Sequence, residues 1–168
     1  MLNSTQISKA ILDLKNDEVI ILPTDTIYGL SALWNKTNEV KINKLKNATN
    51  NKPLIVLISD IKQLDGMHIV ENKAKDLLFE KLTTVIFKMN NDSQTIAVRL
   101  IEREDIKTII DEVGPIFSTS VNKHGDKALN KKEELLNFNL NLNVYFDSEV
   151  TNTKPSKIYN SITDEWIR

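Results

Sequence analysis

The 168-residue sequence contains no cysteine, and this absence excludes several classes of site. Without cysteine the protein has no disulfide, no thiolate nucleophile and no structural zinc site of the common cysteine-based kind. The two histidines, His68 and His124, are too few for a convincing catalytic metal centre. We therefore expect no metal ligands from the protein itself.

Glycine is scarce as well, which limits the kinds of nucleotide site. The four glycines, Gly29, Gly66, Gly114 and Gly125, cannot form G-x-G-x-x-G or G-x-x-x-x-G-K-[ST], the two common phosphate-binding glycine motifs. A nucleotide would need a site of another kind.

Long hydrophobic runs and net charge are also lacking. No apolar segment approaches the roughly 20 residues that a membrane-spanning helix needs, and the first ten residues lack the features of a secretory signal. We expect a cytoplasmic protein without membrane contact. The formal net charge of −1 means that any affinity for nucleic acid must come from a local patch. The composition, 40% hydrophobic and 27% charged, is typical of one globular domain spanning residues 1–168.

Hydrophobic periodicity predicts helices and strands that interleave along the chain. Helices are expected after a cap at Ser4 or Thr5, from about residue 37, and around residues 77–82, 106–110 and 133–136. Strands are expected at 19–22, 53–59, 84–89, 95–100, 115–122, 143–146, 157–160 and 165–168. The short polar segment between the strands at 84–89 and 95–100 indicates a hairpin. These elements predict an α/β (α+β) fold in which helices flank a twisted mixed sheet.

Polar side chains follow the first apolar strand. The run from Val19 ends at Pro23, and the hydroxyl–carboxylate–hydroxyl triplet Thr24, Asp25, Thr26 comes next. Strand ends that lead into polar loops often carry the binding groups of α/β proteins. The same triplet is typical of a turn or a helix cap, so both interpretations stay open.

Two further strands carry an unusual set of polar residues. Alternation in the strand at 95–100 places Thr95 and Arg99 on one face, which would suit a carboxylate or a phosphate. An arginine paired with an acid on the sheet surface explains that pattern equally well. In "STSVN" (residues 118–122), Ser118, Ser120 and Asn122 share one side of an extended segment and could bind phosphate or ribose oxygens; a plain Ser/Thr turn is the alternative.

Lysine is concentrated between residues 36 and 52, where Glu39 is the only acid. A local positive potential of this kind suits a polyphosphate or an RNA backbone, although most lysines are simply solvated surface charges. No aromatic residue is interleaved, so a base-stacking platform is not indicated. The lysines are Lys36, Lys41, Lys44, Lys46 and Lys52.

Taken in order, these segments resemble the YrdC/Sua5 family of threonylcarbamoyl-AMP synthases in its short, single-domain form. The resemblance covers essentially the whole chain, and six collinear motifs carry it. They are "PTDTIYGL", "LKNATNNKPLIVLISD", "LTTVIF", "TIAVRL", "GPIFSTSVN" and "PSKIYNSITDEWIR".

The resemblance implies a fold and a reaction. The fold is a twisted mixed sheet flanked by helices, with a concave, positively charged face. In the reaction, L-threonine, bicarbonate and ATP give threonylcarbamoyl-AMP and pyrophosphate, and downstream transferase machinery places the threonylcarbamoyl group on adenosine 37 of tRNA. A contact between the basic face and tRNA or double-stranded RNA is also implied.

Roles for individual residues follow from the same resemblance. Arg99, Lys46 and Lys52 would be the catalytic cations, Arg99 clamping the threonine carboxylate with its planar fork and Lys46 facing the phosphates. Mg²⁺ would arrive with ATP, because no dedicated carboxylate cluster is visible. The threonine site would consist of Thr24, Tyr28, Arg99, Thr119 and Ser156. The ATP site would consist of Lys46, Lys52, Thr95, Ser118, Ser120, Asn122 and Arg168.

The chain departs from the family pattern at one position. The family writes its lysine segment as K-x-R, whereas this sequence has Lys46, Asn47 and Ala48. Losing one charge-assisted contact typically costs about 1.5–3 kcal/mol. We expect Lys52 to replace part of the missing charge, with Lys44 as the less favoured substitute. Two alternative functions stay open: an RNA-binding or ribosome-binding protein of the same fold without synthase activity, and a family paralogue that uses a different carboxylated or carbamoyl substrate.

Overall fold

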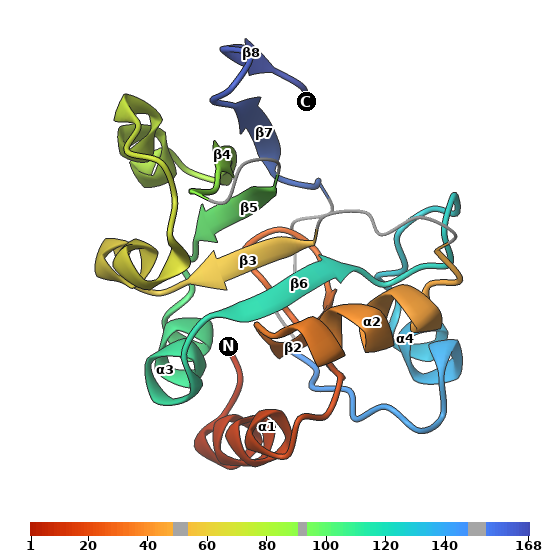
Figure 1. Cartoon of the computed structure of the whole chain (residues 1–168). Coiled ribbons are helices and arrows are strands. Elements are labelled where there is room, and N and C mark those ends of the chain that lie inside the picture. The colour runs from red at the N-terminus through yellow and green to blue at the C-terminus, as the bar shows by residue number, and fades with distance from the viewer. Residues whose placement is uncertain (49–53, 91–93, 148–153) are drawn as a thin grey trace.

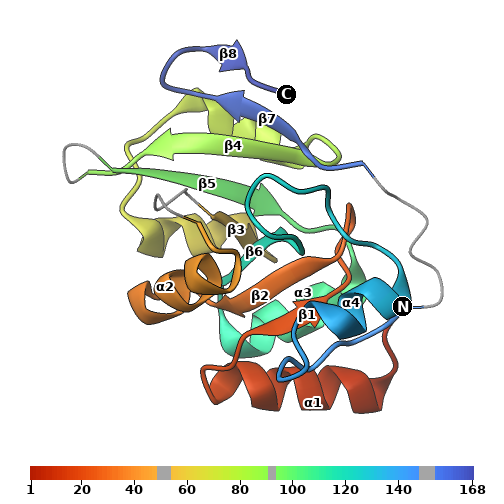
Figure 2. The same cartoon turned by 90° about the vertical axis from the view of Figure 1, so that its right-hand side faces the viewer.

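The computed structural model of the protein describes residues 1–48, 54–90, 94–147 and 154–168. Within these ranges eight strands form one mixed sheet in the order β1-β2-β6-β3-β5-β4-β7-β8, with helices on both faces (Figures 1 and 2). The strands are β1 (Ile20–Leu22), β2 (Gly29–Leu33), β3 (Ile55–Ile58), β4 (Thr83–Lys88), β5 (Thr95–Leu100), β6 (Ile116–Ser120), β7 (Lys157–Asn160) and β8 (Glu165–Trp166). The α-helices are α1 (Ser4–Lys15), α2 (Lys36–Leu45), α3 (Glu104–Val113) and α4 (Lys132–Phe138), and the 3-10 helices are η1 (Ile61–Met67) and η2 (Lys73–Phe79).

Alternating side chains divide the hydrophobic core into two layers, one on each face of the sheet. On one face, Val56 and Ile58 of β3 pack with residues of α2, η1, η2 and α4. On the other face, Leu57 of the same strand packs with α1 and α3, the latter through Ile106 and Ile109. Because neighbouring residues of a strand point to opposite faces, the run "IVLI" is buried on both sides. This confirms the prediction of a central strand in that segment.

The helices begin and end at residues that satisfy their free backbone groups. Asn3, not Ser4 or Thr5, is the N-cap of α1: its side chain accepts from the backbone N–H of Gln6, and the Gln6 side chain accepts from the Asn3 backbone. The predicted cap was therefore wrong by one or two positions. α2 ends at Leu45, and Asn47 follows in the left-handed conformation that ends many helices, with φ of 52°.

The structure also differs from the prediction elsewhere. β2 and η1 were not predicted, and the helix expected around 77–82 is the 3-10 helix η2, which ends before Leu82. The segment 143–146 is not a strand; Val144 forms an isolated parallel bridge with Ile21, and this bridge covers the outer edge of β1. The remaining predicted helices and strands are present within a few residues of their expected bounds.

Different elements lie at the two ends of the molecule. In both views α1 lies at one end of the molecule, while β7, β8 and the C-terminus lie at the other (Figures 1 and 2). β7 pairs in parallel with β4, and β8 pairs back onto β7. The α1 and α3 layer therefore leaves part of its face of the sheet uncovered, and the candidate site lies there.

Candidate active site

A cavity of about 340 Å³ opens on the α1 and α3 face of the sheet, which is within the usual size range of small-molecule sites. Its floor is a row of residues that the strand register places side by side. Ser118 of β6 is opposite Ile55 of β3, Ile55 is opposite Ala97 of β5, and Ala97 is opposite Ile86 of β4. Because four strands contribute one residue each, the floor is part of the sheet itself.

Gly29, the first residue of β2, leaves room for one of the floor side chains. A Cβ atom added at Gly29 would lie 2.2 Å from Oγ of Ser118, much closer than real contacts allow. The absence of a side chain at residue 29 thus leaves room for the Ser118 hydroxyl, and both residues line the cavity.

The loop between β1 and β2 forms one wall through hydroxyl groups. The hydroxyl of Thr24 donates to the carbonyl of Ile27 at 2.7 Å and lies 3.0 Å from the hydroxyl of Thr26. The backbone N–H of Thr26 also donates to Thr24 Oγ1. Both threonines are almost fully buried. The segment is therefore an internally bonded turn, and its two threonines line the cavity. The turn interpretation is confirmed, and a role in binding stays a prediction.

Arg99 lies beside this wall and is the most buried cation of the site, with 4% of its surface exposed. Its Nη1 donates to Thr26 Oγ1 at 3.0 Å, and its Nη2 forms an ion pair with Asp25 Oδ1 at 3.0 Å. Burial lowers the pKa of Arg99, and the Asp25 carboxylate opposes that effect. An arginine keeps its charge in such surroundings, so a fixed cation borders the cavity.

The C-terminal residues form the opposite wall. The hydroxyl of Ser156 is buried and lies 2.9 Å from the hydroxyl of Thr84, which connects this segment to β4. Arg168 donates from Nε to the carbonyl of Ser156 at 3.0 Å and is close enough to Arg99 to lower the pKa of that residue further. Two guanidinium groups, one from β5 and one from the C-terminal segment, therefore border one cavity.

Lys46 lies next to the cavity, at the end of β6. Its Nζ donates to the Ser120 carbonyl at 2.5 Å, to the Asn122 carbonyl at 3.1 Å and to Asn122 Oδ1 at 2.8 Å. Ser120 Oγ donates to the same Oδ1 at 2.6 Å. All three acceptors of Lys46 are uncharged, and burial lowers the pKa of Lys46 to about 8. The ammonium group thus has no carboxylate partner among the described residues.

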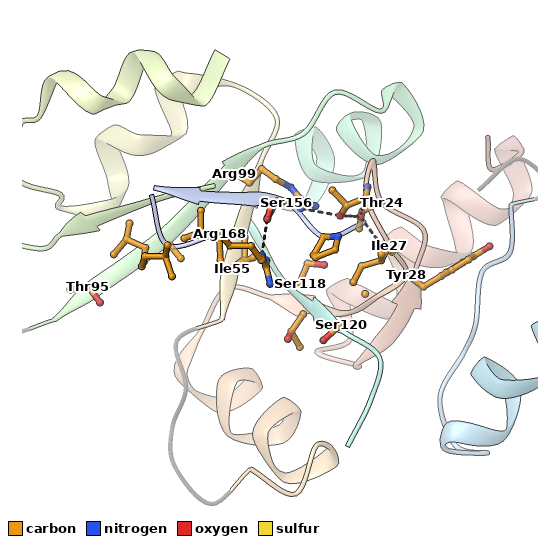
Figure 3. Close-up of a pocket in the computed structure, with 18 residues that line it drawn as sticks. Thr24, Ile27, Tyr28, Ile55, Thr95, Arg99, Ser118, Ser120, Ser156 and Arg168 are labelled. Carbon is orange, nitrogen blue, oxygen red and sulfur yellow. Dashed lines mark hydrogen bonds between the residues drawn. The ribbon is translucent and has the colours of Figure 1, made fainter. Parts of the chain in front are cut away.

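Tyr28 lines the cavity, but its ring points away from it (Figure 3). The phenol donates to the carbonyl of Asp147 at 3.2 Å, and the ring packs edge-on against Phe146 with 6.1 Å between centroids. The tyrosine hydroxyl is thus occupied by a contact that holds the wall in place.

The structure brings most of the predicted site residues together. Those that line the cavity are Thr24, Tyr28, Thr95, Arg99, Ser118, Thr119, Ser120, Ser156 and Arg168. Within this set Thr95 lies at the far end of the cavity from Thr24 and Arg99 (Figure 3). Lys46 and Asn122 do not line the cavity and contact it through Ser120. Lys52 lies outside the described residues.

Three further residues shape the site: Asp25 and Thr26, which were named from the sequence only as part of the triplet, and Thr84, which was given no role. The alternation of hydroxyl and carboxylate in "TDT" was a signal for the first two. Nothing local marked Thr84, whose partner Ser156 is far away in the sequence.

Neither a metal cluster nor a membrane span is found in the part of the chain that the structure describes. No group of three or more histidine, aspartate or glutamate side chains there could hold a metal ion. No helix in the same ranges is long and apolar enough to span a bilayer. The polar side chains that the described residues bring to the cavity include hydroxyl and guanidinium groups, with the Lys46 ammonium group beside them.

These groups define a class of site. Two guanidinium groups suit carboxylates and phosphates, a neighbouring lysine adds a point charge, and the hydroxyl groups can bind polar ligand atoms. The cavity offers no cysteine or histidine as nucleophile. Its guanidinium groups suit small anionic ligands.

The family of the chain follows from its match to known proteins. The model of the Sua5/YciO/YrdC family, which has the description "Telomere recombination", matches residues 13–168. The chain belongs to the Sua5/YciO/YrdC family.

Curated relatives of the chain have one name in common. A Bacillus subtilis protein named threonylcarbamoyl-AMP synthase is 32% identical over an alignment of 148 residues that covers 79% of this chain and 43% of that protein. A Pseudoalteromonas translucida protein of the same name is 27% identical over the full length of both chains. The chain thus spans less than half of the first relative and all of the second.

Solved structures share the fold. Sua5 of P. abyssi, in complex with L-threonine, superposes with a TM-score of 0.78 at 19% identity, covering 95% of this chain and 52% of that one. YciO of E. coli superposes with a TM-score of 0.78 at 17% identity, covering 94% and 84%. At these identities the likeness establishes the fold, and it confirms the predicted mixed sheet flanked by helices.

Proposed function

We propose that the protein is a threonylcarbamoyl-AMP synthase, which makes threonylcarbamoyl-AMP and pyrophosphate from L-threonine, bicarbonate and ATP. The observation that carries the proposal is the convergence of Arg99, Arg168 and a set of hydroxyl groups on one cavity. The names of the relatives support the synthase and not the RNA-binding alternative.

The reaction needs orientation and charge neutralisation more than a nucleophile from the protein. The threonine amine and bicarbonate condense to a carbamate with loss of water. A carbamate oxygen then attacks the α-phosphorus of ATP, and the bond to the bridging oxygen of pyrophosphate breaks. Because the nucleophile is part of the substrate, the lack of cysteine in the chain is no obstacle. The protein contributes by holding the reactants together and by stabilising charge on the phosphates.

We place threonine at the end of the cavity bordered by Thr24 and Arg99, with its carboxylate on the guanidinium. Ser156 closes that end from the side of β4. The Thr119 contact to threonine and the role of Tyr28 remain proposals, and the ring position of Tyr28 supports a role in holding the wall.

ATP would extend along β6 toward Lys46. Ser118, Ser120 and Asn122 would bind it, and Lys46 would exchange its neutral acceptors for phosphate oxygens. Thr95 and Arg168 would complete the nucleotide contacts. Mg²⁺ would be held chiefly by the triphosphate, since the described residues offer no carboxylate cluster. The product would serve a transferase that modifies tRNA.

The proposal is tested by pyrophosphate release. Release should require L-threonine and bicarbonate together, and equal release with either one omitted would contradict the proposal. Arg99→Lys should weaken the use of threonine far more than that of ATP, because an ammonium group keeps the charge but not the two-pronged geometry. A wild-type threonine dependence in this variant would remove Arg99 from its proposed role.

A further inference from the structure

The ion pair between Asp25 and Arg99 is unusual because both partners are buried. The side chains are 7% and 4% exposed, and Asp25 Oδ1 lies 3.0 Å from Arg99 Nη2. The other carboxylate oxygen of Asp25 accepts from the backbone N–H of Glu102 at 3.4 Å. The carboxylate therefore bridges the loop between β1 and β2 to the segment that follows β5.

The partners of Arg99 are distributed unevenly over its guanidinium group. Nη2 faces Asp25, and Nη1 donates to the hydroxyl of Thr26. Nε is buried and has no hydrogen-bond partner among the described residues. A guanidinium group can bind a carboxylate in a two-pronged fashion through Nε and a second N–H. The contacts of Nη1 and Nη2 thus fix the orientation of the guanidinium group, and the buried Nε keeps an unused hydrogen-bond donor.

The same contacts extend into the wall of the cavity. Thr26, held by Arg99, lies 3.0 Å from the hydroxyl of Thr24, which donates to the Ile27 carbonyl. A shift of the guanidinium group would therefore disturb the hydroxyl groups at the same end of the cavity.

We propose that Asp25 is a positioning residue for recognition of the threonine carboxylate. It holds the Arg99 guanidinium group in one fixed orientation at the border of the cavity, and it does not touch the ligand itself. This inference rests on the proposed function of the site.

A simpler role for Asp25, neutralising the charge of Arg99, predicts the opposite effect of its removal on threonine binding. If the carboxylate only neutralised a buried cation, it would compete with an anionic ligand for Arg99, and its removal would strengthen threonine binding. Arg168 already adds a second positive charge near Arg99. If Asp25 positions Arg99, its removal weakens threonine binding despite the gain in positive charge.

Two substitutions separate these roles. Asp25→Asn removes the charge at nearly constant shape, and Asp25→Glu keeps the charge but displaces it by one methylene group. We expect both variants to raise KM for L-threonine about tenfold, because a two-pronged contact depends strongly on geometry, and to leave KM for ATP within about twofold. The matched control is Glu112→Gln, which removes a carboxylate from an exposed ion pair with Lys15 and should change neither constant.

The assay is pyrophosphate release with one substrate varied at a time, with circular dichroism to verify folding. A wild-type or lower KM for threonine in Asp25→Glu would overturn the inference, as would equal increases in the two KM values. Combining Asp25→Asn with Arg99→Lys should add less than about threefold to the threonine KM of Arg99→Lys alone; full additivity would contradict a shared role. If pyrophosphate release by the wild-type protein does not depend on threonine, the proposed function fails. That outcome is distinct from the outcomes that test Asp25, which compare the KM values of the variants with those of the wild type.

Discussion

The ionisation of Lys46 should make the use of ATP strongly dependent on pH. Its ammonium group is held by uncharged acceptors, and burial lowers its pKa from the ordinary value of 10.5 to about 8. Only the charged form can attract phosphate oxygens. The value of kcat/KM for ATP reports the ionisation of the free enzyme, so it should fall as the pH rises through about 8.

The size of the fall follows from the pKa. With a pKa of about 8, roughly 90% of Lys46 is charged at pH 7 and roughly 10% at pH 9, a change of about ninefold. A lysine with its ordinary pKa of 10.5 would stay almost fully charged over the same range. Binding of ATP should raise the pKa again, because phosphate charge favours the ammonium form, so kcat should fall less than kcat/KM.

The assay compares the wild-type protein with Lys46→Arg between pH 7 and pH 9, at saturating threonine and bicarbonate. Arginine stays charged throughout this range, so the variant should lose the fall even if its activity is lower. Ionisation of the substrates affects both proteins equally and cancels in the ratio. Loss of stability at Lys46 does not explain a fall in kcat/KM. Between about pH 8 and 10.5 Lys46 is protonated in the unfolded chain and deprotonated in the folded one, so its titration makes the free energy of unfolding rise with pH.

A flat wild-type profile up to pH 9 would refute this reasoning. A fall of equal size in Lys46→Arg would also refute it, because the titrating group would then be another residue.

Two further substitutions test the floor of the cavity and the departure from the family pattern. Gly29→Ala should displace the Ser118 hydroxyl, raise KM for ATP several-fold and destabilise the protein by about 1–3 kcal/mol through overpacking. The control is Gly66→Ala, because nothing lies within 4 Å of a Cβ at that position. Equal effects of the two variants on KM for ATP would contradict the placement of Ser118 in the ATP site. Ala48→Arg adds a guanidinium group two residues after Lys46 and should lower KM for ATP about tenfold, measured by pyrophosphate release; an unchanged KM would show that residue 48 does not face the phosphates.

The periodicity of apolar residues correctly predicted those helices and strands whose local sequence agrees with their surroundings in the fold. β5 was predicted with its observed bounds, and the face shared by Thr95 and Arg99 does line the cavity. α3 carries buried Ile106, Ile109 and Ile110 at helical spacing, so its period was visible in the sequence. In both segments the side-chain period agrees with the tertiary environment.

Tertiary pairing decided the elements that were missed. β2, with the sequence "GLSAL", contains three small residues and has little β-propensity of its own. It is a strand because β1 and β6 pair with it on both sides, with Gly29 opposite Ser120. Segment 143–146 has strong β-propensity, yet it forms an isolated bridge at the edge of β1.

The position of the site also depends on the pairing of strands that are far apart in the sequence. Its residues could be named from the sequence as polar groups at strand ends, but their meeting point follows from the strand order β2-β6-β3-β5-β4. The alternative that Arg99 pairs with an acid is confirmed by Asp25, although the pair is buried and not on the sheet surface. The two residues are far apart in the chain, and no local pattern identified Asp25 as the partner. The expectation that Lys52 replaces the missing arginine charge falls outside the described residues and stays a prediction.

The central claim is that the cavity joins threonine, bicarbonate and ATP into one adenylate. The direct measurement is mass spectrometry of the products after incubation with L-threonine, ¹³C-bicarbonate and ATP. We predict threonylcarbamoyl-AMP that carries the ¹³C label, in amounts equal to the pyrophosphate released and absent without threonine. Pyrophosphate or ADP without a labelled adenylate would contradict the claim.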